Sequence, residues 1–132
     1  MGKELAWGKT GMKRLLVLVE GQTEETFVKE VLNDYFVSKG IFLTPVLATT
    51  KRVRVGKNFR GGITSYDRVQ YDIQRLLGDT SVRAVTTMLD YYGLPPNFPG
   101  MDDRPGGNCY ERVVYVERAL ANQVNDRRFY PF

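Results

Sequence analysis

Three carboxylate side chains stand where strands are expected to end or a helix to begin. Glu20 follows the apolar run RLLVLV (14–19), Glu24 comes four residues later, and Asp90 closes the run RAVTTMLD (83–90). The carboxyl ends of parallel strands meet at one edge of a sheet, so Glu20 and Asp90 would lie close together if their strands are neighbours. Oxygen ligands without nitrogen or sulfur suit Mg²⁺ or Mn²⁺. The spacing therefore indicates a candidate metal site.

Each of these acids also has a structural explanation. Acids in the first turn of a helix are favoured by the helix dipole alone, which accounts for Glu24 taken singly. An aspartate after a buried strand, such as Asp90, is often a turn or cap residue. Glutamate has no comparable turn role, so we favour a functional explanation for Glu20. Spacing alone leaves the metal site a hypothesis.

The composition excludes several kinds of catalysis. The chain has 132 residues and no histidine, so Ser-His-Asp and Cys-His mechanisms and histidine-ligated zinc are ruled out. A single cysteine, Cys109, can form neither an internal disulfide nor a cysteine metal cluster. Chemistry in this chain must rest on carboxylates, cations, hydroxyls or a bound hard metal.

A run of basic residues is the most uneven feature of the charge pattern. The segment KRVRVGKNFRGG contains five cations and no acid, while the formal net charge of the chain is only +4. Such a segment attracts polyanions, and we expect it to contact a nucleic-acid backbone. A solvated, flexible loop is an equally good explanation. The five cations are Lys51, Arg52, Arg54, Lys57 and Arg60.

The order of apolar runs predicts a three-layer α/β domain with a mainly parallel central sheet and helices on both faces. Strands are expected at 14–19, 41–49 and 83–90 and near 128–132, with Pro45 placing the second at an edge or bulge. Helices are expected from Thr23 as N-cap to Gly40, from Ser65 to Gly78, and over 109–124, although VVYV within the last could instead begin a strand. The segment 51–64 is expected to be a loop or a hairpin.

The same pattern predicts the limits of the domain and the cellular compartment of the protein. Residues 1–11 form an N-terminal extension or tag-like segment before a single domain over 12–132. No apolar run approaches the ~20 residues that cross a bilayer, and the start lacks the apolar core of a signal peptide. We expect a cytoplasmic protein without a membrane partner.

Three blocks of the sequence resemble a known family. LVLVEGQTEETFVKEVL, GGITSYDRVQYDIQRLL and TTMLDYYGLPPNFPG, in that order, are similar to bacterial proteins of the domain of unknown function 4276 (DUF4276) family. The resemblance covers residues 12–132 and implies a Toprim-like fold, related to Rossmann-like sheets and to the Toprim domain of overcoming-lysogenization-defect nucleases. Relatives look longer than this chain, which implies a form truncated at the C-terminus.

The resemblance implies roles for the three acids. Glu20 corresponds to the glutamate after the first strand, Asp90 to the first aspartate of a DxD pair, and Glu24 to a second acid used by the nuclease branch. Together they would hold Mg²⁺ or Mn²⁺, with Glu20 and Asp90 catalytic. Tyr92 stands where the second aspartate belongs. Asp102 or Asp103 could substitute for it.

Two functions follow from this resemblance. The first is an Mg-dependent nuclease-like domain in a phage-defence or DNA-repair system. It would hydrolyse the phosphodiester bonds of DNA rather than those of RNA. The alternative is a non-catalytic Toprim-like binding or regulatory module for an ATPase of the ABC or structural-maintenance type. A homodimer is a further expectation.

Overall fold

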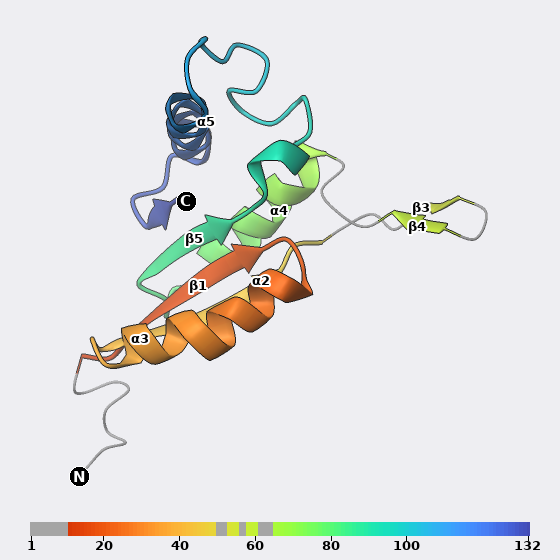
Figure 1. Cartoon of the computed structure of the whole chain (residues 1–132). Coiled ribbons are helices and arrows are strands. Elements are labelled where there is room, and N and C mark those ends of the chain that lie inside the picture. Colours follow the sequence, from red (N-terminus) through yellow and green to blue (C-terminus); the bar gives the residue numbers. More distant parts are fainter. Residues whose placement is uncertain (1–10, 50–52, 56–57, 61–64) are drawn as a thin grey trace.

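A four-stranded sheet, parallel throughout, forms the centre of the molecule (Figure 1). The computed structural model describes residues 11–49, 53–55, 58–60 and 65–132. The strand order across the sheet is β2–β1–β5–β6. The strands are β1 (Lys13–Val19), β2 (Ile41–Leu47), β5 (Ala84–Met88) and β6 (Phe129–Tyr130).

Helices cover both faces of this sheet, which confirms the predicted three-layer α/β architecture (Figure 1). One helical stretch follows β1, and two further helices pack on the other face. The first stretch consists of α2 (Gln22–Phe27), the π-helical η1 (Val28–Leu32) and α3 (Asn33–Val37), and the opposite helices are α4 (Tyr66–Leu77) and α5 (Cys109–Val124). None of the described helices is long and apolar enough to cross a membrane.

Strand β1 is buried on both sides, as its continuous apolar run predicts. Leu16 and Leu18 belong to the larger core cluster, which includes residues of α4 and α5. Val17 and Val19 belong to a smaller cluster with Val28, on the side of α2. Alternation of side chains along the strand therefore supplies two separate cores, and Glu20 follows directly where that burial ends.

Three local predictions have clear outcomes. Pro45 lies in β2, which is an edge strand, so the missing N–H of proline interrupts no inner pairing. The segment 51–64 contains an antiparallel hairpin of β3 (Val53–Val55) and β4 (Asn58–Arg60). The predicted N-cap at Thr23 is wrong, because Gly21 is the N-cap and its carbonyl accepts the N–H of Glu25 at 3.1 Å.

The long segment between β5 and α5 is anchored by packing. It begins with the short 3-10 helix η2 (Tyr91–Gly93). Phe98 is 3% exposed and meets the Tyr66 ring edge-on at 5.3 Å, while the side chain of Asn97 accepts the Tyr66 N–H at 3.0 Å. Gly100 has φ +82° and approaches so closely that a Cβ there would lie 2.8 Å from that of Ala119. The loop therefore holds a defined position above α4 and α5.

A buried carboxylate joins α4 to the end of β2. Asp72 is 4% exposed, and its oxygens accept the backbone N–H of Thr49 at 2.6 Å and the Thr49 hydroxyl at 2.7 Å. Asp72→Ala would leave both donors without their acceptor. We expect this substitution to lower the free energy of unfolding by roughly 3 kcal/mol in urea denaturation, because hydrogen bonds to charged groups are the strong ones.

Asp67→Ala is the matched control for that experiment. Asp67 lies in the first turn of the same helix and is exposed, so its removal forfeits only a favourable interaction with the helix dipole. Its expected effect is below about 1 kcal/mol. Equal losses in the two variants would show that the contact with Thr49 contributes nothing beyond helix propensity.

Candidate functional site

Glu20 and Asp90 lie together at the carboxyl edge of the sheet, as the sequence predicts. They follow β1 and β5, which are neighbours paired in parallel, with Val19 opposite Met88. The Oε1 atom of Glu20 accepts the backbone N–H of Asp90 at 3.0 Å. The glutamate thus joins the ends of two strands that are separated by 70 positions in the chain.

Asp90 also has the structural role that turn residues often have. It is the N-cap of η2, and its Oδ1 atom accepts the backbone N–H of Tyr92 at 3.1 Å. This bond fixes the orientation of the Asp90 carboxylate and engages one of its oxygens. The capping role and a metal-binding role are compatible, because each carboxylate has a second oxygen.

The second oxygens of the two carboxylates converge on Gly93. A Cβ built at Gly93 would lie 3.5 Å from Glu20 Oε2 and 3.7 Å from Asp90 Oδ2. Neither of these two atoms accepts a hydrogen bond from the described residues, whereas Oε1 and Oδ1 do. The absence of a side chain at Gly93 therefore leaves open the place that both free oxygens face. Carboxylate oxygens so placed are the donor set of a hard cation.

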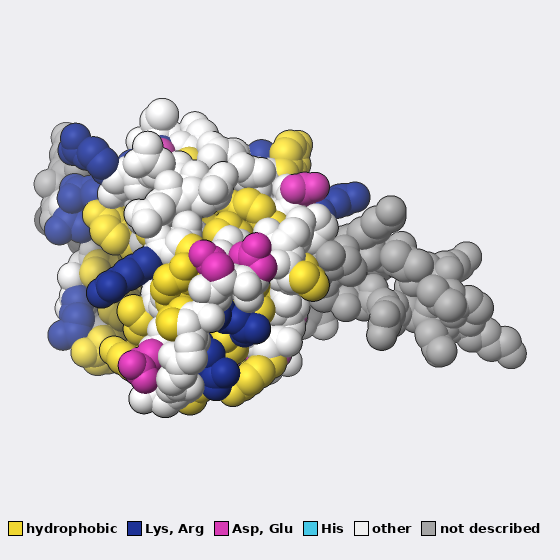
Figure 2. Space-filling view, turned by 90° about the horizontal axis from the view of Figure 1, so that it is seen from above, with side chains coloured by type: hydrophobic (Ala, Val, Ile, Leu, Met, Phe, Trp, Pro, Cys, Tyr) yellow, Lys and Arg dark blue, Asp and Glu magenta, His cyan; other side chains and the backbone are white. Residues whose placement is uncertain are grey.

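Glu24 lies near the same turn but is not gathered with the pair. It is in the first turn of α2 and half-buried, and its Oε1 atom lies 3.7 Å from a Cβ built on Gly21. Within the described ranges, no three acidic or cysteine side chains form a group that could hold a metal ion. In Figure 2 the acidic side chains of the visible face lie in small separate groups. The structure thus brings together two of the three predicted ligands.

The tyrosine at the place of the second aspartate is exposed, and in the described chain neither candidate substitute joins Glu20 and Asp90 in a group of three acids. Tyr92 is 83% exposed and meets the Tyr91 ring edge-on at 5.3 Å. Asp103 accepts the hydroxyl of Tyr115 on α5 at 2.8 Å, and this bond raises the pKa of that tyrosine. Asp102 is exposed and joins no group of three acids among the residues described. Neither aspartate completes the pair.

Arg104 is a cation that contacts the residue after Asp90, and the sequence did not single it out. Its Nη1 atom donates to the hydroxyl of Tyr91 at 2.6 Å, and its guanidinium lies 5.7 Å from the centre of that ring. Tyr91 directly follows Asp90, so the contact ties Arg104 to the segment that begins at the carboxylate pair. Its sequence signal was weak, because Arg104 is a lone cation in a loop whose path depends on Phe98.

Glu117 is a second residue that sequence reasoning missed. It lies on α5 with Val113 and Leu120, and these three residues line a small cavity together with Leu89 and Tyr91. Burial raises the pKa of its carboxyl group. No described cation forms an ion pair with it. The available signal was its position on the helix, four residues after Val113 and three before Leu120, which puts an acid beside the apolar stripe.

The predicted nucleic-acid-binding residues fall largely outside the described part of the chain. This holds for Lys51, Arg52 and Lys57 entirely. For Arg54 and Arg60 the structure describes the backbone, in which Arg54 pairs with Phe59 and Arg60 with Val53 across the hairpin. The proposed contact of this segment with nucleic acid stays a prediction.

Comparison with known proteins gives one match. A family model described as "Domain of unknown function (DUF4276)" matches residues 19–132, which include β1's last residue, both carboxylates of the pair and the C-terminal strand. No curated protein and no solved structure matches the chain. The chemistry of the site must therefore be argued from its own residues.

Proposed function

The chain belongs to the DUF4276 family, and we propose that it is a metal-dependent phosphodiesterase of the nuclease type. The observation that carries the proposal is the convergence of Glu20 Oε2 and Asp90 Oδ2 on the open position at Gly93. A Toprim-like relationship, implied by the sequence resemblance, is part of the same proposal. Phosphodiesters of DNA are the proposed substrates.

The donor chemistry at this edge fits Mg²⁺ or Mn²⁺. Magnesium ions are commonly bound through one or two carboxylates, with water and substrate phosphate as the other ligands. Two carboxylates therefore suffice, and the lack of a third acid in the group does not by itself exclude such a site. A bound ion supplies an activated water and stabilises negative charge on the phosphate.

The chain's own residues would position the substrate around that pair. Glu20 and Asp90 would hold the ion through their outer oxygens. Of the inner oxygens, Glu20 Oε1 joins the two strand ends and Asp90 Oδ1 caps η2. Glu24, in the first turn of α2, is proposed as a further acid that would act from outside the pair. Arg104 would offer a guanidinium for a phosphate oxygen, since its bond to the Tyr91 hydroxyl ties it to the residue that follows Asp90. The basic segment 51–60 would contact the phosphate backbone of the DNA farther from the cleaved bond.

Metal binding is the first test of this proposal. We expect calorimetric titration with Mg²⁺ or Mn²⁺ to give saturable binding to the unsubstituted protein. Glu20→Gln and Asp90→Asn should each weaken it by more than about tenfold, the loss that follows removal of even an outer partner of a metal ligand. Glu30→Gln removes an equal charge from an exposed position in η1 and should leave the affinity unchanged.

The outcomes of that titration separate the proposal from its rival. Equal affinities in all four proteins would place the metal elsewhere. Absence of saturable binding at millimolar metal would remove the basis of the phosphodiesterase proposal. Thermal denaturation of each variant checks that the fold is retained, since both carboxylates also hold backbone N–H groups.

A second candidate function is a non-catalytic module that binds an ATPase of the ABC or structural-maintenance type. Exposed Tyr92 at the place of a second aspartate, and the lack of a three-acid group in the described residues, favour it. In that case the loop and the carboxyl edge of the sheet would form the interface. A role in phage defence or DNA repair is proposed for either function.

A further inference from the structure

A basic pocket lies at the edge of the sheet opposite the carboxylates. It has a volume of about 400 Å³ and is formed by the start of β1, the turn that precedes β5, and the residue before β6. Of the residues that the structure describes, four cationic ones and no acidic one line it: Lys13, Arg14, Arg83 and Arg128. β1 has seven residues, so the pocket is about 20 Å from Glu20 at the usual rise per residue.

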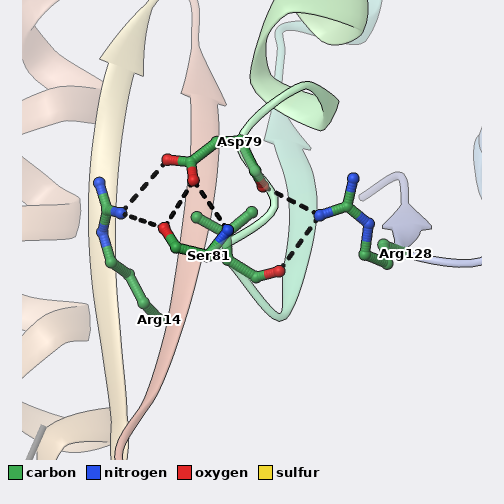
Figure 3. A network of polar contacts seen from close by, with 5 residues as sticks. Arg14, Asp79, Ser81 and Arg128 are labelled. Carbon is green, nitrogen blue, oxygen red and sulfur yellow. Dashed lines mark hydrogen bonds and ion pairs between the residues drawn. The ribbon is translucent and has the colours of Figure 1, made fainter. Parts of the chain in front are cut away.

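Two of the four cations are held in place by the turn between them (Figure 3). Arg14 Nη1 donates to Asp79 Oδ2 and to the Ser81 hydroxyl, each at 3.3 Å. Arg128 donates to the backbone carbonyls of Asp79 at 3.0 Å and Val82 at 3.2 Å, and to that of Leu77. Both guanidinium groups are therefore ordered before any ligand arrives.

Asp79 supports this arrangement without lining the pocket. Its carboxylate accepts the hydroxyl of Ser81 at 2.5 Å and the backbone N–H of Ser81 at 2.9 Å. These bonds, together with Arg14, hold the pKa of Asp79 below its ordinary value, so the group stays ionised at neutral pH. Asp79 thus orients Arg14 from outside the pocket, and every charged residue among the described lining is a cation.

The other two cations have no acidic partner in the described part of the chain. Lys13 and Arg83 are exposed, and neither forms an ion pair there. The Arg83 N–H donates to the Arg14 carbonyl at 2.8 Å, so two arginines stand side by side on adjacent strands. Like charges so placed repel each other. An anion between them would relieve that repulsion.

We propose that this pocket binds a phosphoryl group, carried by a small phosphorylated molecule or by the end of a nucleic acid. Arginine presents a planar fork of donors that matches phosphate oxygens, and ordered guanidinium groups lose little freedom on binding. The Thr80 hydroxyl in the lining adds a neutral donor. The site is independent of the carboxylate pair, because one phosphoryl group cannot reach both edges of the sheet.

The test is calorimetric titration of the metal-free protein with pyrophosphate at constant ionic strength. Lys13→Gln and Arg83→Gln are the informative variants, since neither side chain holds another part of the fold. Each is expected to weaken binding about fivefold or more, the effect of losing a charge-assisted contact. Arg118→Gln removes the same charge from an exposed position on α5 and should bind as the unsubstituted protein does.

Further arms identify the source of the phosphate and keep the two sites apart. A 5′-phosphorylated oligonucleotide that displaces pyrophosphate, when its unphosphorylated form does not, would identify a nucleic-acid end as the ligand. Failure of both to displace it would identify a small phosphorylated molecule. Glu20→Gln should leave pyrophosphate binding intact whatever its effect on metal. Lack of saturable pyrophosphate binding, or equal affinities in Lys13→Gln, Arg83→Gln and Arg118→Gln, would overturn the proposal.

Discussion

Glu20→Gln is expected to slow Mg²⁺-dependent cleavage of a DNA oligonucleotide by roughly a hundredfold or more, because a bound metal contributes several kcal/mol of charge stabilisation. The amide keeps one oxygen and the size of the side chain but loses the charge. Its remaining oxygen can still accept the Asp90 N–H, so the strand ends should stay in register. Cleavage is measured on single-stranded and duplex DNA with the metal in excess.

Gly93→Ala tests the same site without removing a carboxylate. The added methyl group would meet Glu20 Oε2 and Asp90 Oδ2 at ordinary contact distances of 3.5 and 3.7 Å, so the fold should tolerate it. It would, however, fill the space that both free oxygens face, and cleavage should fall with it. Gly106→Ala is the control, since a Cβ at Gly106 meets nothing within 4 Å.

The two variants together decide between the candidate functions. Loss of cleavage in Glu20→Gln and Gly93→Ala, with Gly106→Ala unaffected, would locate the chemistry at the carboxyl edge of the sheet. Unchanged cleavage in Glu20→Gln would place the activity at other residues. A wild-type protein that binds metal and cleaves neither substrate would favour the binding-module alternative.

The fold was largely predictable because its strands have unambiguous signals. The apolar run before Glu20 indicated a strand covered on both faces, and Pro45 indicated an edge. Two helix boundaries were also predicted, with Ser65 as N-cap and Gly78 as C-cap of α4. The alternative strand within 109–124 is ruled out by α5, whose start is fixed by a capping box between Asn108 and Glu111.

The misses have a common physical cause. Thr23 looks like an N-cap by residue type, but the tight connection from β1 starts the helix earlier, at Gly21. The π-helical η1 was not predicted, and its buried residue, Val28, packs in the smaller core cluster with Val17, Val19 and Leu43. Local residue preferences cannot show either effect, because both depend on how the helical stretch packs against β1 and β2.

Part of the candidate site was predictable from the sequence, and part of it depends on packing between distant residues. The proximity of Glu20 and Asp90 follows from β1 and β5 being neighbours, which was the condition that the sequence-based prediction set. Gly93, Arg104 and the basic pocket could not be predicted in this way. Each depends on where a loop or turn is held by distant residues, such as Phe98 for the long loop and Arg128 for the turn before β5.

Leu18→Ala should give the largest loss of stability among single substitutions in β1. Leu18 is 0% exposed, pairs with Val46 and Thr87 in the register of the sheet, and belongs to the larger core cluster. Truncation leaves a cavity under α4 and α5, with an expected loss of about 3 kcal/mol or more in the free energy of unfolding. Urea denaturation measures it.

Leu47→Ala is the control, because Leu47 ends edge strand β2 and is 42% exposed. Its loss should be below about 1 kcal/mol. Comparable losses in the two variants would contradict the packing of β1 between two layers. Leu18 points into the core while Glu20, two residues on, lies just after the strand, so the folded fraction of Leu18→Ala should keep its metal affinity. Stability and the candidate chemistry would then be carried by different residues of one strand.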